Sequence, residues 1–554
     1  MNSKNNNTSP KLIYVKWPNE KELKCPICGS DIKYLYNDGG RRVITLQGII
    51  KLYTCYYSCT NKKCEYKRPH SVFQNIVLPY KHFGLDVWRW VIIDYIEFHD
   101  PYTTISRRLY SHFNLKISSN TVKSIVETFL AANSDQAIEE TKKLVRKNGK
   151  IYLMLDGQKP NKKDHMLWIF IDTITDRILH MEYLMTSNSK ILSEILLKIQ
   201  DKYGVPIKAV VSDHQSSIIK AVKEALPGVP HQYCHFHFLK NLSRSISPFD
   251  SHLHVELAKC LNKLAYYKLN APDIDLMINN TTYNIKNMVS MILEDINRLI
   301  NRKSRNFDFF NGFELYNDLE KFIDMIKNIQ SLISDNNKFY KILSKIENTI
   351  KTALKQNKNL YNNVRQLIPL FNEIRAILSV QAKNSNEVKK RADQWAENIK
   401  QIIKMKIGKF NSKKLKYKRT TYKSDLLSAL LEWYRLYKTH KSGLFYYCDY
   451  KKLPRSIVEL EQLFSLESRH FRKCSGNSQV GNSIRTKGGE YCQIITCYSQ
   501  DRIMTVLLKL GKSYLKNSTK RFRERQLKCL SYRYYRKEKY PLTNILIRNL
   551  KYSG

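Results

Sequence analysis

The sequence predicts a multidomain α/β protein. A cysteine-rich ribbon and a helix-turn-helix precede a mixed-sheet core, and a long all-helical insertion interrupts that core. Three observations predict this class: cysteines gather near the N-terminus, strand-like and helix-like segments alternate over 150–240, and helical apolar spacing with few Gly or Pro fills 241–450. A chain of 554 residues can hold about three or four domains. The cysteine-rich ribbon is expected over 1–80 and the helix-turn-helix over 81–148. The core is expected in two parts, 149–240 and 451–500, separated by the helical insertion over 241–450. A basic tail is expected over 501–554.

The net charge points to a polyanionic partner. Lys and Arg number 94 against 49 Asp and Glu, which gives a formal charge of +45. Such an excess is typical of nucleic-acid-binding proteins, and a hydrophobic fraction of 42% excludes a disordered basic tail. No apolar run reaches the roughly 18 residues of a membrane span, and the opening MNSKNNNTSPK lacks a signal-peptide core. We therefore expect a cytoplasmic or nucleoid-associated protein with no membrane partner.

The N-terminal cysteines have the spacing of a metal knuckle. The first two are separated by two residues, a tight arrangement that presents two thiolates to one tetrahedral ion. The second pair is spaced more widely than usual, and Cys55 with Cys59 is its alternative. Alternating and β-branched residues over 41–57 fit the hairpin of a zinc ribbon. Reduced cysteines without a metal are the simpler interpretation. The predicted ligands of a structural Zn²⁺ are Cys25, Cys28, Cys59 and Cys64.

Three helices are predicted after this ribbon. Apolar spacing predicts helices over 83–98 and 102–113, with Asp100-Pro101 ending the first. A short turn over 114–118 follows, and Ser119 is expected to cap a third helix. This pattern fits a helix-turn-helix whose third helix enters a major groove, although a plain three-helix bundle has the same pattern. The candidate DNA contacts are Arg107, Arg108, Asn120, Thr121 and Lys123.

The next segment alternates between strands and helices. Strands are predicted over 151–155, 166–171, 178–184, 207–211 and 229–233, and helices over 189–203 and 216–226. The first three strands can form a meander, and the later strands then add by crossovers. The result is a mixed sheet with helices on its faces.

Two aspartates follow buried strands of this core. Asp156 comes after the first strand and Asp213 after the fourth, and each alone could simply cap a turn. If the two strands are neighbours, both carboxylates open at the same sheet edge, where they repel one another unless a divalent cation joins them. Oxygen ligands favour Mg²⁺ or Mn²⁺. Two such ions can activate an attacking hydroxyl and stabilise the leaving oxygen of a phosphodiester.

These residues resemble the DDE transposases of the Mutator-like group and their prokaryotic insertion-sequence relatives. The resemblance rests on Leu155-Asp156-Gly157, Val211-Ser212-Asp213 and the Cys234-x-x-His237 that trails the second aspartate, behind a zinc module and a helix-turn-helix. It covers 25–240 well and the rest loosely. The resemblance implies a ribonuclease-H-like fold for the core, with catalytic Asp156 and Asp213 holding Mg²⁺ or Mn²⁺.

The resemblance also implies a third carboxylate beyond the helical insertion. The chain there reads Leu453-Pro-Arg-Ser-Ile-Val-Glu-Leu-Glu461-Gln-Leu-Phe464, followed by basic residues. This is similar to the family's pattern of a Ser or Thr, a Leu-Glu pair and a Phe, which makes Glu461 the third ligand. The family usually has Asn residues where Ile457 and Val458 stand, and this departure leaves rivals. They are Glu459 and Glu467.

The motif formed by Cys234 and His237 has two interpretations. By resemblance it belongs to the catalytic core, where it shapes the site or contacts DNA. A buried Cys and a hydrogen-bonded His are the simpler interpretation.

Two stretches concentrate the positive charge. Residues 398–424 hold ten Lys or Arg and no acid, and 502–551 hold fifteen basic residues against two acids. Such runs predict phosphate contacts that position DNA without reading its sequence. Tyrosines interleave with the second run, where they either stack on unpaired bases or pack a small helical domain. They are Tyr532, Tyr534, Tyr535 and Tyr540.

Together these features favour a transposase that acts on double-stranded DNA, at both transposon ends and target. Asp156, Asp213 and Glu461 would support cleavage at element ends and strand transfer into the target. Because two ends must meet, we expect a homodimer or a larger assembly. The alternative is a catalytically inactive or repurposed transposase that acts as a DNA-binding protein, and a third interpretation is a ribonuclease-H-like nuclease that cuts without joining.

Overall fold

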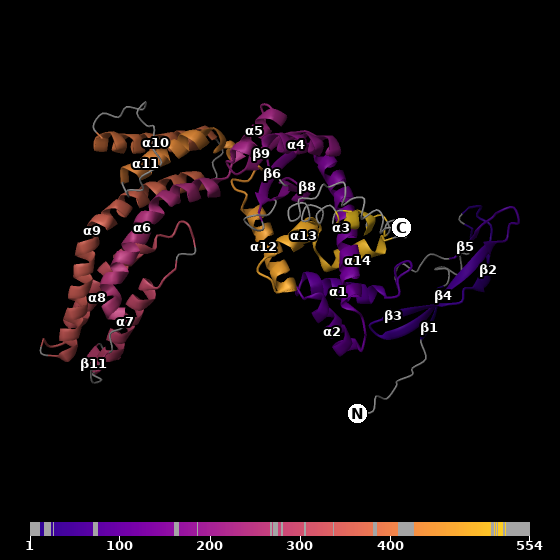
Figure 1. The fold of residues 1–554 in the computed structure, drawn as a ribbon, viewed down its shortest axis with the longest axis horizontal. Helices are drawn as coiled ribbons and strands as arrows, with labels where there is room; N and C mark the ends of the chain where they lie inside the picture. Colours follow the sequence, from indigo (N-terminus) through magenta and orange to yellow (C-terminus); the bar gives the residue numbers. More distant parts are fainter. Residues whose placement is uncertain are drawn as a thin grey trace, which may run out of the picture. The chain divides into compact units, whose positions relative to one another are not determined.

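The computed structural model is shown in Figure 1. It describes residues 11–15, 24–25, 27–69, 76–159, 166–184, 187–265, 269, 275–278, 281–303, 306–335, 337–380, 385–407, 426–510, 515, 517, 519–524 and 527. The described residues form two compact units. One holds those up to 208, 217–229 and those from 458 on, and the other holds 209–216 and 230–457. No helix within the described ranges is long and apolar enough to cross a membrane.

The N-terminal ribbon is a five-stranded sheet built around one long strand. Its strands are β1 (Lys11–Val15), β2 (Ile32–Asn37), β3 (Arg41–Thr45), β4 (Gly48–Cys59) and β5 (Lys67–Pro69). All four other strands pair with β4, and β1 alone does so in parallel. Alternate residues of β4 are buried from Ile50 to Thr54, with Ile50 and Leu52 packed against Val43 and Val77. The β3–β4 hairpin confirms the strand pattern predicted over 41–57.

Three helices follow, α1 (Leu85–Ile96), α2 (Tyr102–Phe113) and α3 (Ser119–Asn148). The bounds of α2 are those predicted. The predicted cap is wrong by one residue, because Ser118 precedes the helix and its Oγ accepts a hydrogen bond from the Thr121 N–H at 3.1 Å. Between α2 and α3, Asn114 adopts a left-handed conformation with φ of 52°.

The central sheet is mixed, as predicted. Its elements are β6 (Ile151–Gln158), β7 (Met166–Asp172), β8 (Arg177–Leu184), α4 (Ser189–Tyr203), β9 (Ile207–Ser212), α5 (Ser216–Ala225) and β10 (His231–Tyr233). The first three strands form an antiparallel meander, and β9 pairs with β10 in parallel. The strand order is β10-β9-β6-β7-β8. Gly204, with φ of 68°, ends α4 at the predicted residue.

The first unit also contains the described helices α12 (Val458–Ser475), α13 (Gly481–Cys497) and α14 (Gln500–Leu508). Helix α13 packs on α3, and α14 packs on both α1 and α3. Part of the predicted basic tail is therefore a docked helix. Arg502 at its start donates to Glu140 at 2.5 Å and to Asn133 at 3.2 Å, so this guanidinium is engaged within the protein. The tyrosines predicted to interleave with the tail lie outside the described residues.

The second unit contains the helical insertion. Its elements after β10 are α6 (His235–Ala265), β11 (Asp275–Ile278), β12 (Thr281–Asn284), α7 (Ile285–Ile300), α8 (Asn311–Gln330), α9 (Lys338–Ser379), α10 (Ser385–Ile407), α11 (Leu426–His440), η3 (Lys441–Gly443) and η4 (Tyr446–Cys448). Helix α6 runs along α8 and α9, as Figure 1 shows. In the basic run over 398–424, only 398–407 belong to α10, and the rest lies outside the described residues.

The prediction of an all-helical insertion is wrong at one place. Strands β11 and β12 form a small antiparallel hairpin, and the Asn284 side chain donates to Asp275 at 2.9 Å across it. Two asparagines, Asn279 and Asn280, separate the two strands in the sequence. Such asparagine pairs between short β-prone stretches favour a hairpin. The prediction missed it because helical apolar spacing dominates the sequence on both sides.

Candidate functional site

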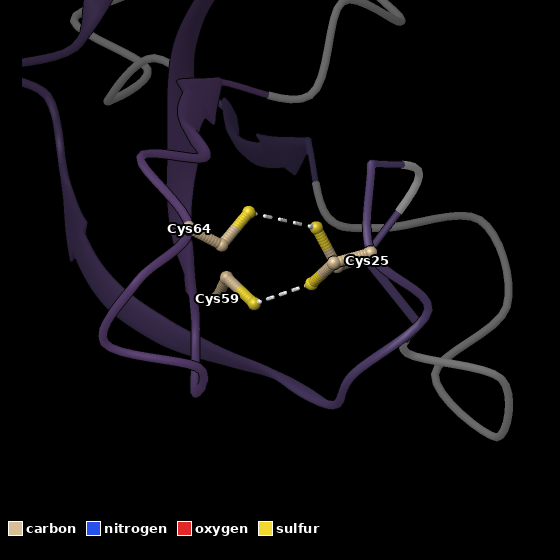
Figure 2. A group of neighbouring side chains, drawn as sticks. Cys25, Cys59 and Cys64 are labelled. Atoms are coloured by element: carbon tan, nitrogen blue, oxygen red, sulfur yellow. Dashed lines mark hydrogen bonds between the residues drawn. The ribbon is translucent and has the colours of Figure 1, made fainter.

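Four cysteines of the ribbon come together as a candidate metal centre. The Sγ atoms of Cys25, Cys28, Cys59 and Cys64 all lie within 4.8 Å of one another. Cys25 and Cys64 are 3.7 Å apart at sulfur, and Cys28 and Cys59 are 3.4 Å apart, with the labelled thiols turned toward one another in Figure 2. A tetrahedral ion with Zn–S bonds of about 2.3 Å separates its sulfurs by about 3.8 Å. The group can therefore hold one structural Zn²⁺.

Local backbone structure holds each cysteine pair in place. Gly29 adopts φ of 73°, and its N–H donates to the Cys25 carbonyl at 2.8 Å, which closes the first knuckle. In the second pair the Asn61 N–H donates to Cys59 Sγ at 3.4 Å. Hydrogen bonds from Ser30 lower the pKa of Cys28 to about 6, which favours the thiolate that a metal requires. Desolvation raises the pKa of Cys59 to about 12, so that metal binding must displace its proton.

The structure decides between the two predicted second pairs. Cys59 and Cys64 belong to the group of four, and Cys55 does not. Cys55 is buried beside Ile32 and Tyr57 in the apolar cluster that supports the knuckles. The wider Cys59–Cys64 spacing is thus compatible with a four-thiolate site.

Replacing Cys59 by Ser is expected to abolish zinc binding by the full-length chain and to lower its melting temperature, because one of four thiolates is lost. The matched control is Cys55→Ser, a neighbouring buried cysteine outside the group of four. Metal content measured after extensive dialysis, together with a thermal melt, checks this. One zinc per chain in the Cys59 variant would show that these thiols are not the ligands.

Asp156 lies on β6, just after its buried apolar run. The first five residues of this strand are buried, whereas Asp156, Gly157 and Gln158 are half-buried. Asp156 Oδ1 accepts the Gly157 N–H at 2.8 Å. A Cβ at Gly157 would lie 2.8 Å from the fully buried ring of its cross-strand neighbour Trp168, so glycine suits the close pairing of β6 with β7. The carboxylate therefore sits at a rigid strand end.

Asp213 directly follows β9 and is half-buried. The hydroxyl of buried Ser212 lies 2.8 Å from His231 Nε2, and the His214 ring stacks on His440 with centroids 3.8 Å apart. Burial lowers the pKa of His231 to about 3 and that of His440 to about 4, so both rings are neutral at pH 7. Sequence reasoning missed His440, which is more than two hundred residues away and carries no local signal.

Helix α12 carries all three candidate third carboxylates, and burial separates them. Glu459 is exposed, Glu461 is half-buried, and Glu467 has no exposed surface. The Gln158 amide of β6 reaches Ser468 of α12 at 3.5 Å, a long hydrogen bond that marks where helix and strand meet. Glu461 precedes Ser468 by two helical turns and therefore lies on the same face of α12.

Glu467 points into the interface between α12 and α13. Its carboxyl is beside the Cys492 thiol, and a Cβ at Gly488 would collide with it. Desolvation raises the pKa of Glu467 to about 8. Glu467 is thus enclosed between two helices, whereas Glu461 is half-buried.

Cys234 immediately precedes helix α6, and His237 lies in its first turn. Cys234 is buried, its N–H donates to the Ser212 carbonyl at 2.8 Å, and its Sγ accepts the Ile457 N–H at 3.4 Å. The thiol therefore ties the end of β9 to the residue just before α12. His237 is half-buried, and desolvation, with Lys240 and Arg244 nearby, lowers its pKa. For Cys234 the simpler prediction of a buried cysteine describes the geometry.

The candidate DNA contacts of the three-helix segment differ in how available they are. Arg107 is exposed on α2, and Asn120 and Lys123 are exposed in the first turn of α3. Thr121 is half-buried and bonded to the Ser118 cap. Arg108 is engaged within the protein, at 2.5 Å from Asp100 and 3.5 Å from Asp94.

A buried polar network that sequence reasoning missed joins α12 and α13 to the three-helix segment. His99 and His470 lie 2.9 Å apart at Nδ1, and His470 stacks on Tyr491 with centroids 3.9 Å apart. Lys487 of α13, only 15% exposed, lies 3.7 Å from Glu127 of α3 and also contacts the Tyr102 hydroxyl. The helix that carries Glu461 is therefore fixed to the segment that carries Asn120.

Residues 173–311 of the chain match the family model described as Transposase, Mutator family. The matched range begins just after β7 and ends at the first residue of α8. It includes Asp213, Cys234 and His237, whereas Asp156 and Glu461 lie outside it. A search of curated proteins finds no match.

Proposed function

We propose that this chain is a Mutator-like transposase, as the family match over residues 173–311 supports, and that it cleaves DNA at the ends of a mobile element and joins the freed 3′ ends to target DNA. The observation that carries the proposal is the strand order. Strand β6 holds Asp156, and its neighbour in the sheet is β9, which ends just before Asp213. Two aspartates on neighbouring strands suit a shared metal site. The meander followed by β9 and β10 supports the ribonuclease-H-like core that the family implies.

Glu461 is the third residue of the proposed site. Side chains alternate along a strand, so Asp156 and Gln158 project from the same face of β6. Gln158 reaches Ser468 on the face of α12 that also carries Glu461. These contacts support a Glu461 carboxylate directed toward the strand of Asp156.

The donor chemistry of the three residues fits Mg²⁺ or Mn²⁺, because all their ligand atoms are carboxylate oxygens. Ions bound there supply activation of the attacking hydroxyl and stabilisation of the leaving oxygen. The chain's own contribution is positioning. Backbone donation from Gly157 orients the Asp156 carboxylate, and the Cys234–Ile457 contact fixes the start of α12.

The three-helix segment supplies the proposed recognition of element ends. Arg107 on α2 and Asn120 and Lys123 on α3 are exposed and fit a helix-turn-helix that enters the major groove. Arg108 is excluded from this set by its ion pairs with Asp94 and Asp100. Pairing of two ends calls for a homodimer or larger assembly on double-stranded DNA, and DNA as the partner suits a nucleoid-associated protein.

Asp156→Asn is expected to lower DNA cleavage and strand transfer by about 10³-fold or more, because an ion ligand worth several kcal/mol is lost. The full-length chain is incubated with Mg²⁺ or Mn²⁺ and DNA that carries the regions flanking its gene. Nicked and joined products are then counted, with DNA affinity as the control. Equal nicking by the variant would refute the catalytic assignment, and nicking without joining would indicate a nuclease.

The sequence argument for the inactive, DNA-binding alternative is the departure from the family pattern at Ile457 and Val458. Ile457 is fully buried and its N–H is bonded to Cys234, so an apolar side chain there serves packing. Val458 is half-buried, and its replacement of the family's Asn still favours the alternative. A wild-type chain that binds DNA but yields no products with either ion would support the alternative.

A further inference from the structure

The helical insertion carries a basic groove that the proposed chemistry does not use. The groove lies between α6 and α9 and has a volume of about 930 Å³. Its lining has one acid, Asp335, against four lysines. The lysines are Lys259 and Lys263 on α6 and Lys341 and Lys345 on α9.

The lysines are arranged in two facing pairs. On each helix the two lysines are four residues apart, so they lie on one face about one turn from each other. All four side chains are exposed, and Lys259 also lies 2.6 Å from Glu256 on its own helix. Four cations around one groove repel one another, and a polyanion in the groove relieves that repulsion.

Most of the other side chains that line the groove are polar. Along α9 the lining consists mainly of hydroxyl and amide side chains: Ser344, Asn348, Thr349, Thr352 and Gln356. Such side chains, with lysines, are the usual partners of phosphate and sugar oxygens in DNA complexes. Polar side chains outnumber apolar ones in the lining, which disfavours a small apolar ligand or a protein hot spot.

We propose that this groove holds the phosphodiester backbone of double-stranded DNA. The inference rests on the proposed function, since a transposase must hold DNA on both sides of the cut, and it assigns the insertion a direct DNA contact. Lysines and hydroxyls bind phosphate without discriminating bases, so this contact adds affinity and register but no sequence preference.

The test compares two full-length variants that lose the same charge. The groove variant replaces Lys259, Lys263, Lys341 and Lys345 by Gln. The control replaces four exposed lysines of the same unit that do not line the groove. They are Lys303, Lys327, Lys389 and Lys390. Binding to a random-sequence duplex is measured over a KCl series. The buffer contains no Mg²⁺, so that no cleavage occurs, and no chelator, so that the zinc stays bound.

Each phosphate contact contributes about 0.9 to the slope of log affinity against log salt. The groove variant is expected to lose about 3 from this slope and at least about 30-fold in affinity at low salt, whereas the control changes far less. Equal changes in both variants would overturn the inference while leaving wild-type DNA binding and cleavage intact. A groove variant that forms a smaller assembly than wild type but binds DNA with unchanged affinity would also overturn the inference. The groove would then be a contact between subunits. Absence of duplex binding by the wild-type chain would instead remove the proposed function itself.

Discussion

Glu461→Gln is expected to reduce DNA cleavage by about 10³-fold or more with Mg²⁺, because the substitution removes the charge of a proposed ion ligand and keeps its size. Glu461 is half-buried on the face of α12 that meets β6 through Ser468. The measurement is the rate of product formation on flanking DNA, with zinc content and melting temperature confirming that the chain is folded.

The exposed Glu459 offers a matched control on the same helix. Glu459→Gln removes one carboxylate two residues away and should leave cleavage within about 3-fold of wild type, as surface substitutions usually do. If Glu459→Gln lost most of its DNA cleavage activity while Glu461→Gln kept full activity, Glu459 would become the proposed third ligand in place of Glu461. Mn²⁺ rescue confined to one variant would point to the residue that contacts the ion.

Elements whose signal is local could be predicted from the sequence. The apolar run of β6, the amphipathic α4 with Gly204 behind it, and the whole of α2 are encoded by neighbouring residues. The cysteine pairs could also be predicted, because each knuckle is a short sequence motif. Only the partner of Cys59, either Cys55 or Cys64, had to be decided from the structure.

Features that depend on contacts between distant segments could not be predicted. The ion pair of Arg502 with Glu140, the stacking of His214 on His440, and the enclosure of Glu467 beside Cys492 each involve residues from different parts of the chain whose own neighbourhoods look ordinary. The helix-turn-helix pattern predicted a DNA contact for Arg108, and charge predicted phosphate contacts for the tail. Arg108 and Arg502 instead form ion pairs within the protein. The ranking of the third carboxylates likewise follows from burial, which sequence spacing on one helix does not reveal.

The stability of the first unit should depend on pH through Glu467. The usual pKa of this carboxyl, 4.5, is raised to about 8 by burial in the folded protein. Between these values the unfolded chain releases a proton that the folded chain keeps, so folding loses stability as the pH rises from 4.5 toward 8. The full shift corresponds to roughly 5 kcal/mol. Glu467→Gln cannot titrate and should escape this loss.

Urea denaturation followed by tryptophan fluorescence at pH 5 and pH 8 measures the effect. The stability of Glu467→Gln relative to wild type should rise by several kcal/mol between the two pH values, whereas Glu459→Gln, on the exposed face, should show no such rise. Parallel curves for wild type and Glu467→Gln would mean that Glu467 is ionised in the folded protein. An ionised carboxylate at that depth needs a cation beside it, and Glu467 would then replace Glu461 as the proposed third ligand.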